Sequence, residues 1–483
     1  MNRTSKGVNK VKNVSGNDAY RLDSKTKLVT MALTTMINEP KCYGDNTDEL
    51  VRLAEALCKA GEGEFVAKLA VWARTEANLR TVSHVLLAIC GKWCHGDPSK
   101  GTEGSFVRAA TRIVASRRAD DGTEIVASYL SMYGKPLPNA IRRGVADALG
   151  SFNAHQLAKY RLTSKEVKLR DVLRLTHPVP RDENSSEAMG GVIDGTLNAP
   201  SGWETEISAR GNVKEVWDEL LADGKVGIFA MVRNMRNIIQ SGADVTPVIE
   251  ALHDRNVVSG SRMLPFRFLS AYRELYLRGL CTKRVIGALD AAMGIACDGI
   301  EWPSGRTAVL VDSSGSMGYP LSTHSSASIL DVAACLASMV ARLSDDVIAI
   351  RFSGFAEVVP VTGASLIADI MAFGSPAGMT SMEAAFNLLD ATGFDADRVI
   401  VLSDNEVNYG KVVVQRRLDD YRRKVGHDVW CHAIDLQGYG TSQFIGDKVQ
   451  VLAGWSERIL EFVRLSEEGH DTLVSHILSI ALS

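Results

Sequence analysis

The stretch at positions 306–318, RTAVLVDSSGSMG, decides the fold of the C-terminal part of the chain. Its apolar run 307–311 has the length of one buried β-strand. The run ends at Asp312, and Ser314 and Ser316 follow in the pattern Asp-x-Ser-x-Ser. Glycines within and after this pattern permit a tight turn. A carboxylate and two hydroxyls on one turn form an oxygen-only set, which hard cations such as Mg²⁺ prefer.

Two later stretches carry polar groups of the same kind. Thr380 follows Gly378 on a second turn that precedes a helical stretch, and the apolar run 399–403 ends at Asp404. Taken alone, Asp-x-Ser-x-Ser is an ordinary polar turn, but ligands of open α/β sheets gather where the strands end. The order and spacing resemble the metal-ion-dependent adhesion site of von Willebrand factor A domains. The predicted ligands of Mg²⁺ or another divalent cation are Asp312, Ser314, Ser316, Thr380 and Asp404.

The sequence after residue 300 alternates between strand-like and helical segments. Short apolar runs are separated by stretches in which apolar residues recur with the helical period. Such alternation predicts a mostly parallel sheet with helices on both faces. Residues 301–483 are therefore expected to form a doubly wound, Rossmann-like α/β domain. The resemblance at the adhesion-type site implies that this domain is of the von Willebrand factor A type.

The first 300 residues show a different organisation. Residues 28–300 read as short helices that recur every ~17–20 residues, a spacing typical of HEAT-like repeats. No β-rich segment is predicted in the first 175 residues. Residues 1–27 hold seven Lys and Arg against two Asp and are expected to be a flexible arm. Residues 178–212, rich in Pro, Gly, Ser and Asn, are expected to be a long loop or insertion.

Composition restricts the class of protein. The chain has 483 residues, of which 46% are hydrophobic and 23% charged, as in soluble proteins with two or more domains. No 18-residue apolar window is present, so no membrane span is expected. The eight cysteines include no Cys-x-x-Cys pair, which favours reduced thiols in a cytoplasmic protein. Cys90, Cys94 and His95 are predicted to be buried helix residues and not a zinc site, because three ligands are too few.

Charge is unevenly distributed along the chain. The net charge is −3, but residues 301–483 carry −10, so the first 300 residues carry +7. Residues 135–181 hold ten Lys and Arg against three Asp and Glu. Most charge runs are solvated helix faces, but this concentration favours an anionic partner, in particular a nucleic acid. The basic residues singled out there are Arg142, Arg143, Lys159, Arg161, Lys168, Arg170 and Arg174.

The order of the two domains resembles the Ro ribonucleoprotein autoantigen family, with its TROVE module, in a bacterial or phage-type form. The motifs that carry the resemblance are LRLTHP at 173–178, MVRNM at 231–235, LPF at 264–266, ALDAA at 288–292, VDSSGSM at 311–317, AGMT at 377–380 and SDNE at 403–406. Each motif is short, but together they follow the family order over nearly the whole chain.

The resemblance implies a specific RNA-binding architecture. In that family the helical repeats close into a monomeric ring, stem-containing Y RNAs bind its outer surface, and single-stranded 3′ ends of misfolded or unprocessed RNAs enter its hole. Members act in RNA quality control, maturation or decay, and bacterial ones work with exoribonucleases. By motif position the family's RNA contacts fall on Lys159 and His177, with Arg161 adjacent. His177, directly before Pro178, is either a buried helix cap or an RNA ligand.

The sequence is compatible with three functions. The first is a non-catalytic RNA-binding protein, and the second is a scaffold module whose metal site captures a carboxylate of a partner protein. The third, a metal-dependent hydrolase, is the weakest, because the sequence has no nucleophile elbow, no phosphate-binding loop and no His-Glu-x-x-His. Salt-dependent RNA binding distinguishes the first from the second. Turnover of labelled RNA would reveal the third.

Overall fold

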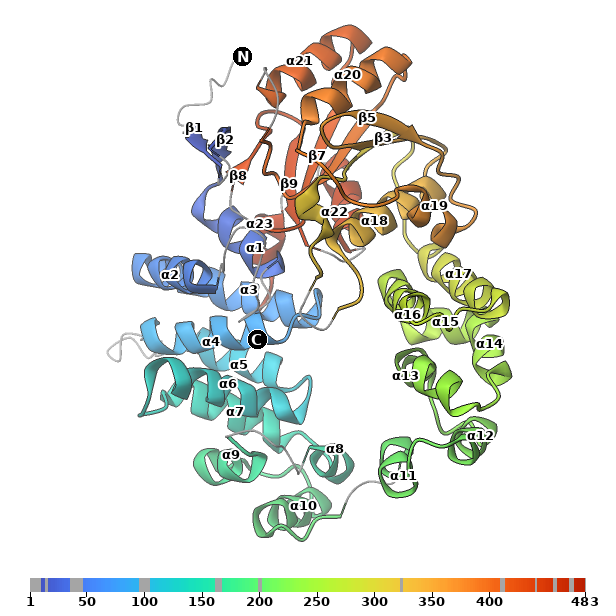
Figure 1. Cartoon of the computed structure of the whole chain (residues 1–483). Coiled ribbons are helices and arrows are strands. Elements are labelled where there is room, and N and C mark those ends of the chain that lie inside the picture. Colours follow the sequence, from blue (N-terminus) through green and yellow to red (C-terminus); the bar gives the residue numbers. More distant parts are fainter. Residues whose placement is uncertain are drawn as a thin grey trace. The chain divides into compact units, whose positions relative to one another are not determined.

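The chain folds into two compact units (Figure 1). The helical unit comprises Ser24–Asn38, Asp45–Thr205 and Leu473–Ser483. The sheet unit comprises Met1–Asp23, Glu39–Gly44 and Glu206–Thr472. The structure is a computed structural model, and it describes residues 10–13, 16–34, 47–94, 105–160, 167–198, 202–321, 325–408, 413–438, 441–454, 458–468 and 473–482.

The helical unit is built from short helices that pack in alternation. Helix α3 packs on α4 and α5, α4 packs on α6, and α5 packs on α7, which is the layering expected of HEAT-like repeats. The predicted helical-repeat fold is thus confirmed. The elements are α1 (Ser24–Thr34), α2 (Thr47–Leu57), a π-helical turn η1 (Cys58–Glu62), α3 (Gly63–Thr75), α4 (Thr81–Trp93), α5 (Ser105–Ala115), α6 (Ala119–Tyr133), α7 (Asn139–Gly150), α8 (Ala154–Lys159), α9 (Leu169–Thr176), α10 (Glu183–Asp194) and α23 (Leu473–Ser479).

A buried ionic network joins the first layers of this unit. Asp121 on α6 is fully buried and accepts hydrogen bonds from Arg74 on α3 and from Arg80. His84 on α4 lies 3.1 Å from the same carboxylate. Burial by itself would raise the pKa of Asp121, but the hydrogen bond with His84 and the two guanidinium charges lower this pKa to about 2. The carboxylate therefore stays charged and ties α3 and α4 to α6.

The sheet unit contains a six-stranded sheet in the order β5-β4-β3-β6-β7-β9, in which only the edge strand β5 is antiparallel. Its strands are β3 (Arg306–Asp312), β4 (Asp346–Phe352), β5 (Ala356–Val359), β6 (Arg398–Ser403), β7 (Trp430–Asp435) and β9 (Val449–Ala453). Its helical segments are α12 (Lys214–Ala222), α13 (Ile228–Ser241), α14 (Thr246–His253), α15 (Arg255–Ser261), α16 (Pro265–Leu277), α17 (Lys283–Cys297), η3 (Gly315–Gly318), α18 (Ile329–Leu343), α19 (Leu366–Ala372), α20 (Met382–Thr392), α21 (Val414–Val425) and α22 (Arg458–Glu467).

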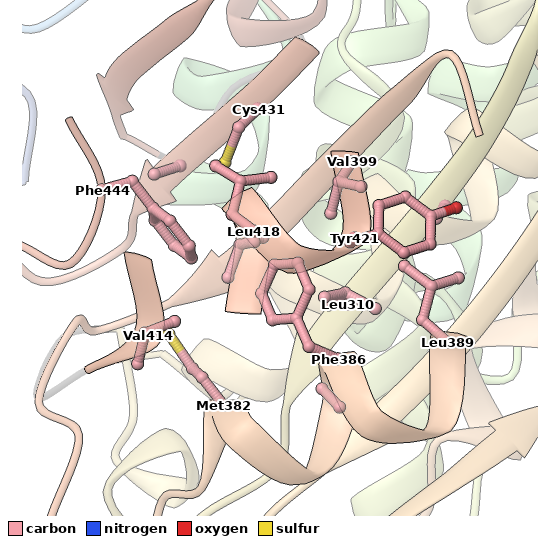
Figure 2. Packing of buried hydrophobic residues seen from close by; sticks show 14 of the residues in the cluster. Leu310, Met382, Phe386, Leu389, Val399, Val414, Leu418, Tyr421, Cys431 and Phe444 are labelled. Atoms are coloured by element: carbon pink, nitrogen blue, oxygen red, sulfur yellow. The ribbon is translucent and has the colours of Figure 1, made fainter. Parts of the chain in front are cut away.

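Both faces of the central strands are buried, as the sequence predicted. Alternate strand residues such as Leu310 and Val399 pack against Phe386 of α20 and Leu418 of α21 on one face (Figure 2). Helix α18 packs on β3 and β4, where the intervening residues are also buried. The predicted doubly wound α/β domain is confirmed, and apolar runs without alternation are what such a sheet requires.

Two segments differ from the sequence-based expectation. Residues 10–21 are not an unstructured arm: β1 (Lys10–Lys12) and β2 (Asp18–Arg21) form a hairpin, and β2 pairs with β8 (Thr441–Ser442). Their charge suggested disorder, but Ala19 and Tyr20 are buried in the sheet unit. Residues 178–212 are not one loop, because α10 and α11 (Trp203–Arg210) lie within them. Apolar residues of α10 are buried, and they outweigh its poor helix formers.

The predicted domain boundary near residue 300 does not separate the compact units. Helices α16 and α17 pack on α18, and α17 also packs on α19. Asp290 of α17 accepts a hydrogen bond of 2.9 Å from the backbone N–H of Ile367. Asp298 accepts from Arg255 and Arg342. These contacts attach the last helices of the predicted helical domain to the sheet. In the described part of the chain, no helix has the length and apolar character that a membrane span requires.

A buried ion pair fixes α22 to the sheet. Arg398 at the start of β6 is 1% exposed, and its guanidinium donates two hydrogen bonds of 2.8 Å to the Glu467 carboxylate. The same carboxylate lies 2.9 Å from Nε2 of the buried His432 on β7. Glu467 therefore neutralises a cation that has no access to solvent.

We expect Glu467→Ala to lower the free energy of unfolding by about 3–5 kcal/mol, because removal of one partner leaves the buried guanidinium uncompensated. Urea denaturation followed by circular dichroism measures the change. Glu468→Ala is the matched control, since the next residue is exposed, and it should change stability by less than about 1 kcal/mol. Equal effects of the two substitutions would contradict this role of the ion pair.

Candidate metal centre and nucleic-acid interface

Asp312 is the buried centre of the predicted metal site. It is the last residue of β3 and has no exposed surface. Its Oδ1 accepts a hydrogen bond of 2.9 Å from the backbone N–H of Ser314, and its Oδ2 accepts one of 2.7 Å from Oγ of Ser403. The carboxylate is thus held by the turn that follows β3 and by the end of the neighbouring strand β6. Sequence reasoning missed Ser403, although its place just before Asp404 at a strand end was visible.

The two serines of the motif lie together on the turn. The Oγ atoms of Ser314 and Ser316 are 3.2 Å apart, and both side chains are buried. Ser316 also lies close enough to Asp404, which follows β6, to offset part of the rise in pKa that burial causes at this carboxyl group. Direct contacts therefore bring together Asp312, Ser314, Ser316 and Asp404, four of the five predicted ligands.

Thr380 reaches the same place through its loop. The backbone N–H of Gly315 donates to the carbonyl of Gly378 over 3.0 Å, and Gly378 has the positive φ of 85° that this turn requires. The N–H of Thr380 donates to Oδ1 of Asn408, a second residue that sequence reasoning missed. Thr380 itself is 1% exposed. The loop between α19 and α20 is thereby fixed against the turn after β3.

The electrostatics of this oxygen cluster favour a cation. Burial, together with the nearby charge of Asp404, raises the pKa of Asp312 to about 7, and burial raises the pKa of Asp404. Oγ1 of Thr380 and Oδ2 of Asp404 are buried, and neither has a hydrogen-bond partner among the described residues. Buried polar oxygens usually have partners. A hard divalent ion would supply one and offset the two carboxylates, so the donor set fits Mg²⁺.

The predicted RNA-binding residues lie on three helices of the helical unit. Arg142 and Arg143 are on α7, Lys159 ends α8, Lys168 precedes α9, and Arg170 and Arg174 are on α9. The apolar face of α9 is buried through Leu169, Val172 and Leu173, which leaves its two arginines exposed. Arg142 is half-buried and hydrogen-bonded to Asn139. Arg161 lies outside the described residues.

His177 is a helix cap, as one of the two alternatives had it, but it is not buried. It ends α9 in the left-handed conformation, with φ of 49°, and its backbone N–H donates to the carbonyl of Leu173. Its imidazole is exposed. The backbone therefore caps the helix while the side chain remains accessible to a ligand.

A groove of about 1400 Å³ lies in the helical unit. It is lined by residues of α4, α5 and α7 and by the end of α9. Of the predicted residues it brings together Arg143 and His177, whereas the other described ones lie outside its lining. Lys92, Arg108 and Arg112 add positive charge that sequence reasoning missed. Arg108 is paired with Asp147 at 2.7 Å, so part of this charge is already balanced.

Comparison with known proteins agrees with this architecture. The TROVE domain model matches residues 194–283, and the Ro60 vWA domain model matches residues 306–433. The structure of the Ro (RSR) protein of Deinococcus radiodurans superposes with a TM-score of 0.63 at 17% identity, covering 91% of this chain and 98% of that one. The fold is therefore shared over nearly the full length of both chains.

Curated relatives match parts of the chain. Telomerase protein component 1 of Rattus norvegicus is 40% identical over 347 residues, which cover 53% of this chain and 13% of the relative. Telomerase protein component 1 of Mus musculus is 40% identical over 82 residues, which cover 16% of this chain and 3% of the relative. The chain thus spans a small part of these relatives. The chain is thus similar to a TROVE domain followed by a Ro60-type von Willebrand factor A domain, and it shares the fold of a Ro protein.

Proposed function

We propose that this chain binds RNA and that the helical unit carries the binding surface. The observation that carries the proposal is the concentration of exposed cations on this unit, in a chain whose net charge is −3. The Ro and TROVE family is an RNA-binding family, which supports the same conclusion. The exposed residues are Arg143, Lys159, Lys168, Arg170, Arg174 and His177.

The positions of these residues suggest two modes of contact. Lys159, Arg170 and Arg174 lie outside the groove and suit the phosphates and 2′-hydroxyls of an RNA stem. Arg143 and His177 line the groove, whose volume exceeds the range of about 300–1,000 Å³ that is usual for small-molecule pockets. An arginine and an imidazole in such a groove suit an unpaired strand, because both groups stack on bases and contact phosphates.

The biological role that we infer is that of a Ro ribonucleoprotein. The chain would hold a small noncoding, Y RNA-like RNA and the single-stranded 3′ ends of misfolded or unprocessed RNAs. It would act without catalysis, in the cytoplasm, as a monomeric ring that presents RNA to an exoribonuclease for quality control, maturation or decay. The arrangement of cations outside and inside one groove supports this division between stem and single strand.

We further propose that the oxygen cluster holds Mg²⁺. Ser314 and Ser316 would bind through their hydroxyls, and Asp312 and Asp404 through carboxylate oxygens, directly or through water. Thr380 would join them, and the remaining positions would stay open to water or to a carboxylate of a partner protein. The partnerless buried oxygens of Thr380 and Asp404 support this assignment. This site gives the sheet unit a second function, metal-dependent protein interaction.

Removal of two exposed cations tests the RNA surface. We expect Lys159→Ala/Arg170→Ala to weaken binding of a stem-loop RNA. The slope of log Kd against log salt concentration should also fall by about 1 for each phosphate that is no longer neutralised. Fluorescence anisotropy at several salt concentrations measures both quantities. The control Arg423→Ala/Lys424→Ala removes the same charge from the exposed surface of α21 and should change neither quantity. Equal Kd values and equal salt dependence for the two double variants would show that the RNA does not bind at Lys159 and Arg170.

Replacement of the exposed imidazole tests the groove. We choose His177→Asn, because asparagine tolerates the left-handed conformation and preserves the helix cap. Loss of stacking should weaken binding of a single-stranded oligoribonucleotide by about 1–3 kcal/mol and leave binding of a blunt hairpin unchanged. The exposed His155 on α8 lies outside the groove lining, so His155→Asn is the control. Equal weakening of hairpin binding would show that His177 does not select unpaired strands.

Removal of the central carboxylate tests the metal site. Asp312→Ala should abolish Mn²⁺ binding measured by electron paramagnetic resonance, with Mg²⁺ competing for the wild-type site. Asp428→Ala removes an exposed carboxylate near the opposite end of β7 and should bind Mn²⁺ as the wild type does. Wild-type protein that binds no Mn²⁺, or equal binding by the two variants, would reject the assignment.

A further inference from the structure

Three cysteines of the helical unit meet in one place. Cys58 begins the π-helical turn after α2, Cys90 is on the last turn of α4, and Cys94 directly follows that helix. Their sulfur atoms all lie within 4.8 Å of one another. His95, which follows Cys94 in the sequence, lies outside the described residues. Cys58 is distant from Cys90 and Cys94 in the sequence and joins them only because helix packing brings α2 beside the end of α4.

The backbone around the cluster is shaped to admit the three sulfurs. The π-helical turn Cys58–Glu62 interrupts regular helical geometry, and Gly61 within it has a φ of 88°. A Cβ atom at Gly63 would lie 2.2 Å from Sγ of Cys94, so any larger residue there would displace this sulfur. Turns of this kind inside helices are frequent at functional sites. The distorted segment and the glycine after it make room for a compact group of sulfurs.

The cluster is buried but accessible from one side. Cys58 and Cys90 are buried, and Cys94 is half-buried. Hydrogen bonds with Cys58 and Cys94, together with burial, raise the pKa of the Cys90 thiol well above its usual range. Cys90 Sγ also lies 3.7 Å from the carbonyl of Gly63. A small ion can therefore reach the sulfurs past Cys94.

We propose that Cys58, Cys90 and Cys94 form a thiolate site for a soft metal ion, Zn²⁺ in the first place. Three protein ligands suffice for Zn²⁺ where water takes the fourth position, as in open zinc sites. Each thiol would release its proton to solvent as it binds. Tetrahedral Zn–S bonds of about 2.3 Å place the sulfurs about 3.8 Å apart, so the observed group needs only a small contraction. Thiolates select Zn²⁺ over the hard cations that suit the oxygen cluster. The ion would cross-link the π-helical turn to the end of α4.

Cobalt spectroscopy of the full-length chain tests the site. Co²⁺ added to reduced, metal-free protein should give a thiolate-to-cobalt charge-transfer band that saturates at one ion per chain and disappears when Zn²⁺ is added. Cys58→Ser should bind Co²⁺ more weakly and give a weaker band per bound ion, because only two thiolates remain. Cys281→Ser, a half-buried cysteine of the sheet unit, is the control and should keep it. Asp312→Ala should also keep it, because oxygen ligands give no thiolate band.

A second measurement needs no variant and so does not depend on how Cys58→Ser folds. Stoichiometric Zn²⁺ should protect Cys94 of the wild-type protein from alkylation, as mass spectrometry of the labelled peptides would show. Wild-type protein that gives no charge-transfer band, an equal band in Cys58→Ser, or alkylation of Cys94 at the same rate with and without Zn²⁺ would each overturn the proposal.

Discussion

Parallel pairing of β3 with β6 is the constraint on which the sheet unit depends. The register sets Val311 opposite Leu402, so Asp312 and Ser403 end neighbouring strands and Asp404 follows directly. A slip of one residue would turn the apolar side chains of a strand to the opposite face and move the carboxylate away from its partners. The two acidic groups share a buried place, which is why the pKa of Asp312 rises to about 7. Burial of the strands thus leaves two acidic groups side by side at their ends.

The topology of the sheet explains why the site forms there. The chain runs outward from β3 to β4 and then returns to the other side of β3 with β6. At such a switch point the loops after neighbouring strands diverge and leave space between them. The turn after β3 and the residues after β6 supply the oxygen donors, and the loop that carries Thr380 is tied to them through Gly378 and Gly315. The helices on both faces therefore bury the strands, and the loops supply the polar side chains of the oxygen cluster.

In the helical unit, the groups that hold the fold together are separate from the exposed cations. Its helices are held by apolar faces and by the buried Asp121 network, so its exposed cations are not needed for packing. The exposed arginines of α9 can therefore contact a polyanion at little cost in the stability of the fold. Residues 1–300 carry a net charge of +7 and residues 301–483 one of −10, so an anionic partner is favoured on the first part and disfavoured on the second. The proposed division of RNA binding and metal binding between the two units rests on this distribution.

Local patterns in the sequence determined the element types and the oxygen-bearing residues at the strand ends. Apolar runs ending in Asp312 and Asp404 indicate strands that end in a carboxylate, because strand length and residue type are local properties. Composition failed for residues 10–21 and 178–212, where burial of Tyr20 and of the apolar side of α10 outweighs charge and polarity. Only the tertiary structure joined Cys58 to Cys90 and Cys94, or Arg143 to His177 across the groove. These groups come from different helices, and their proximity depends on how whole helices pack, which no short stretch of sequence specifies.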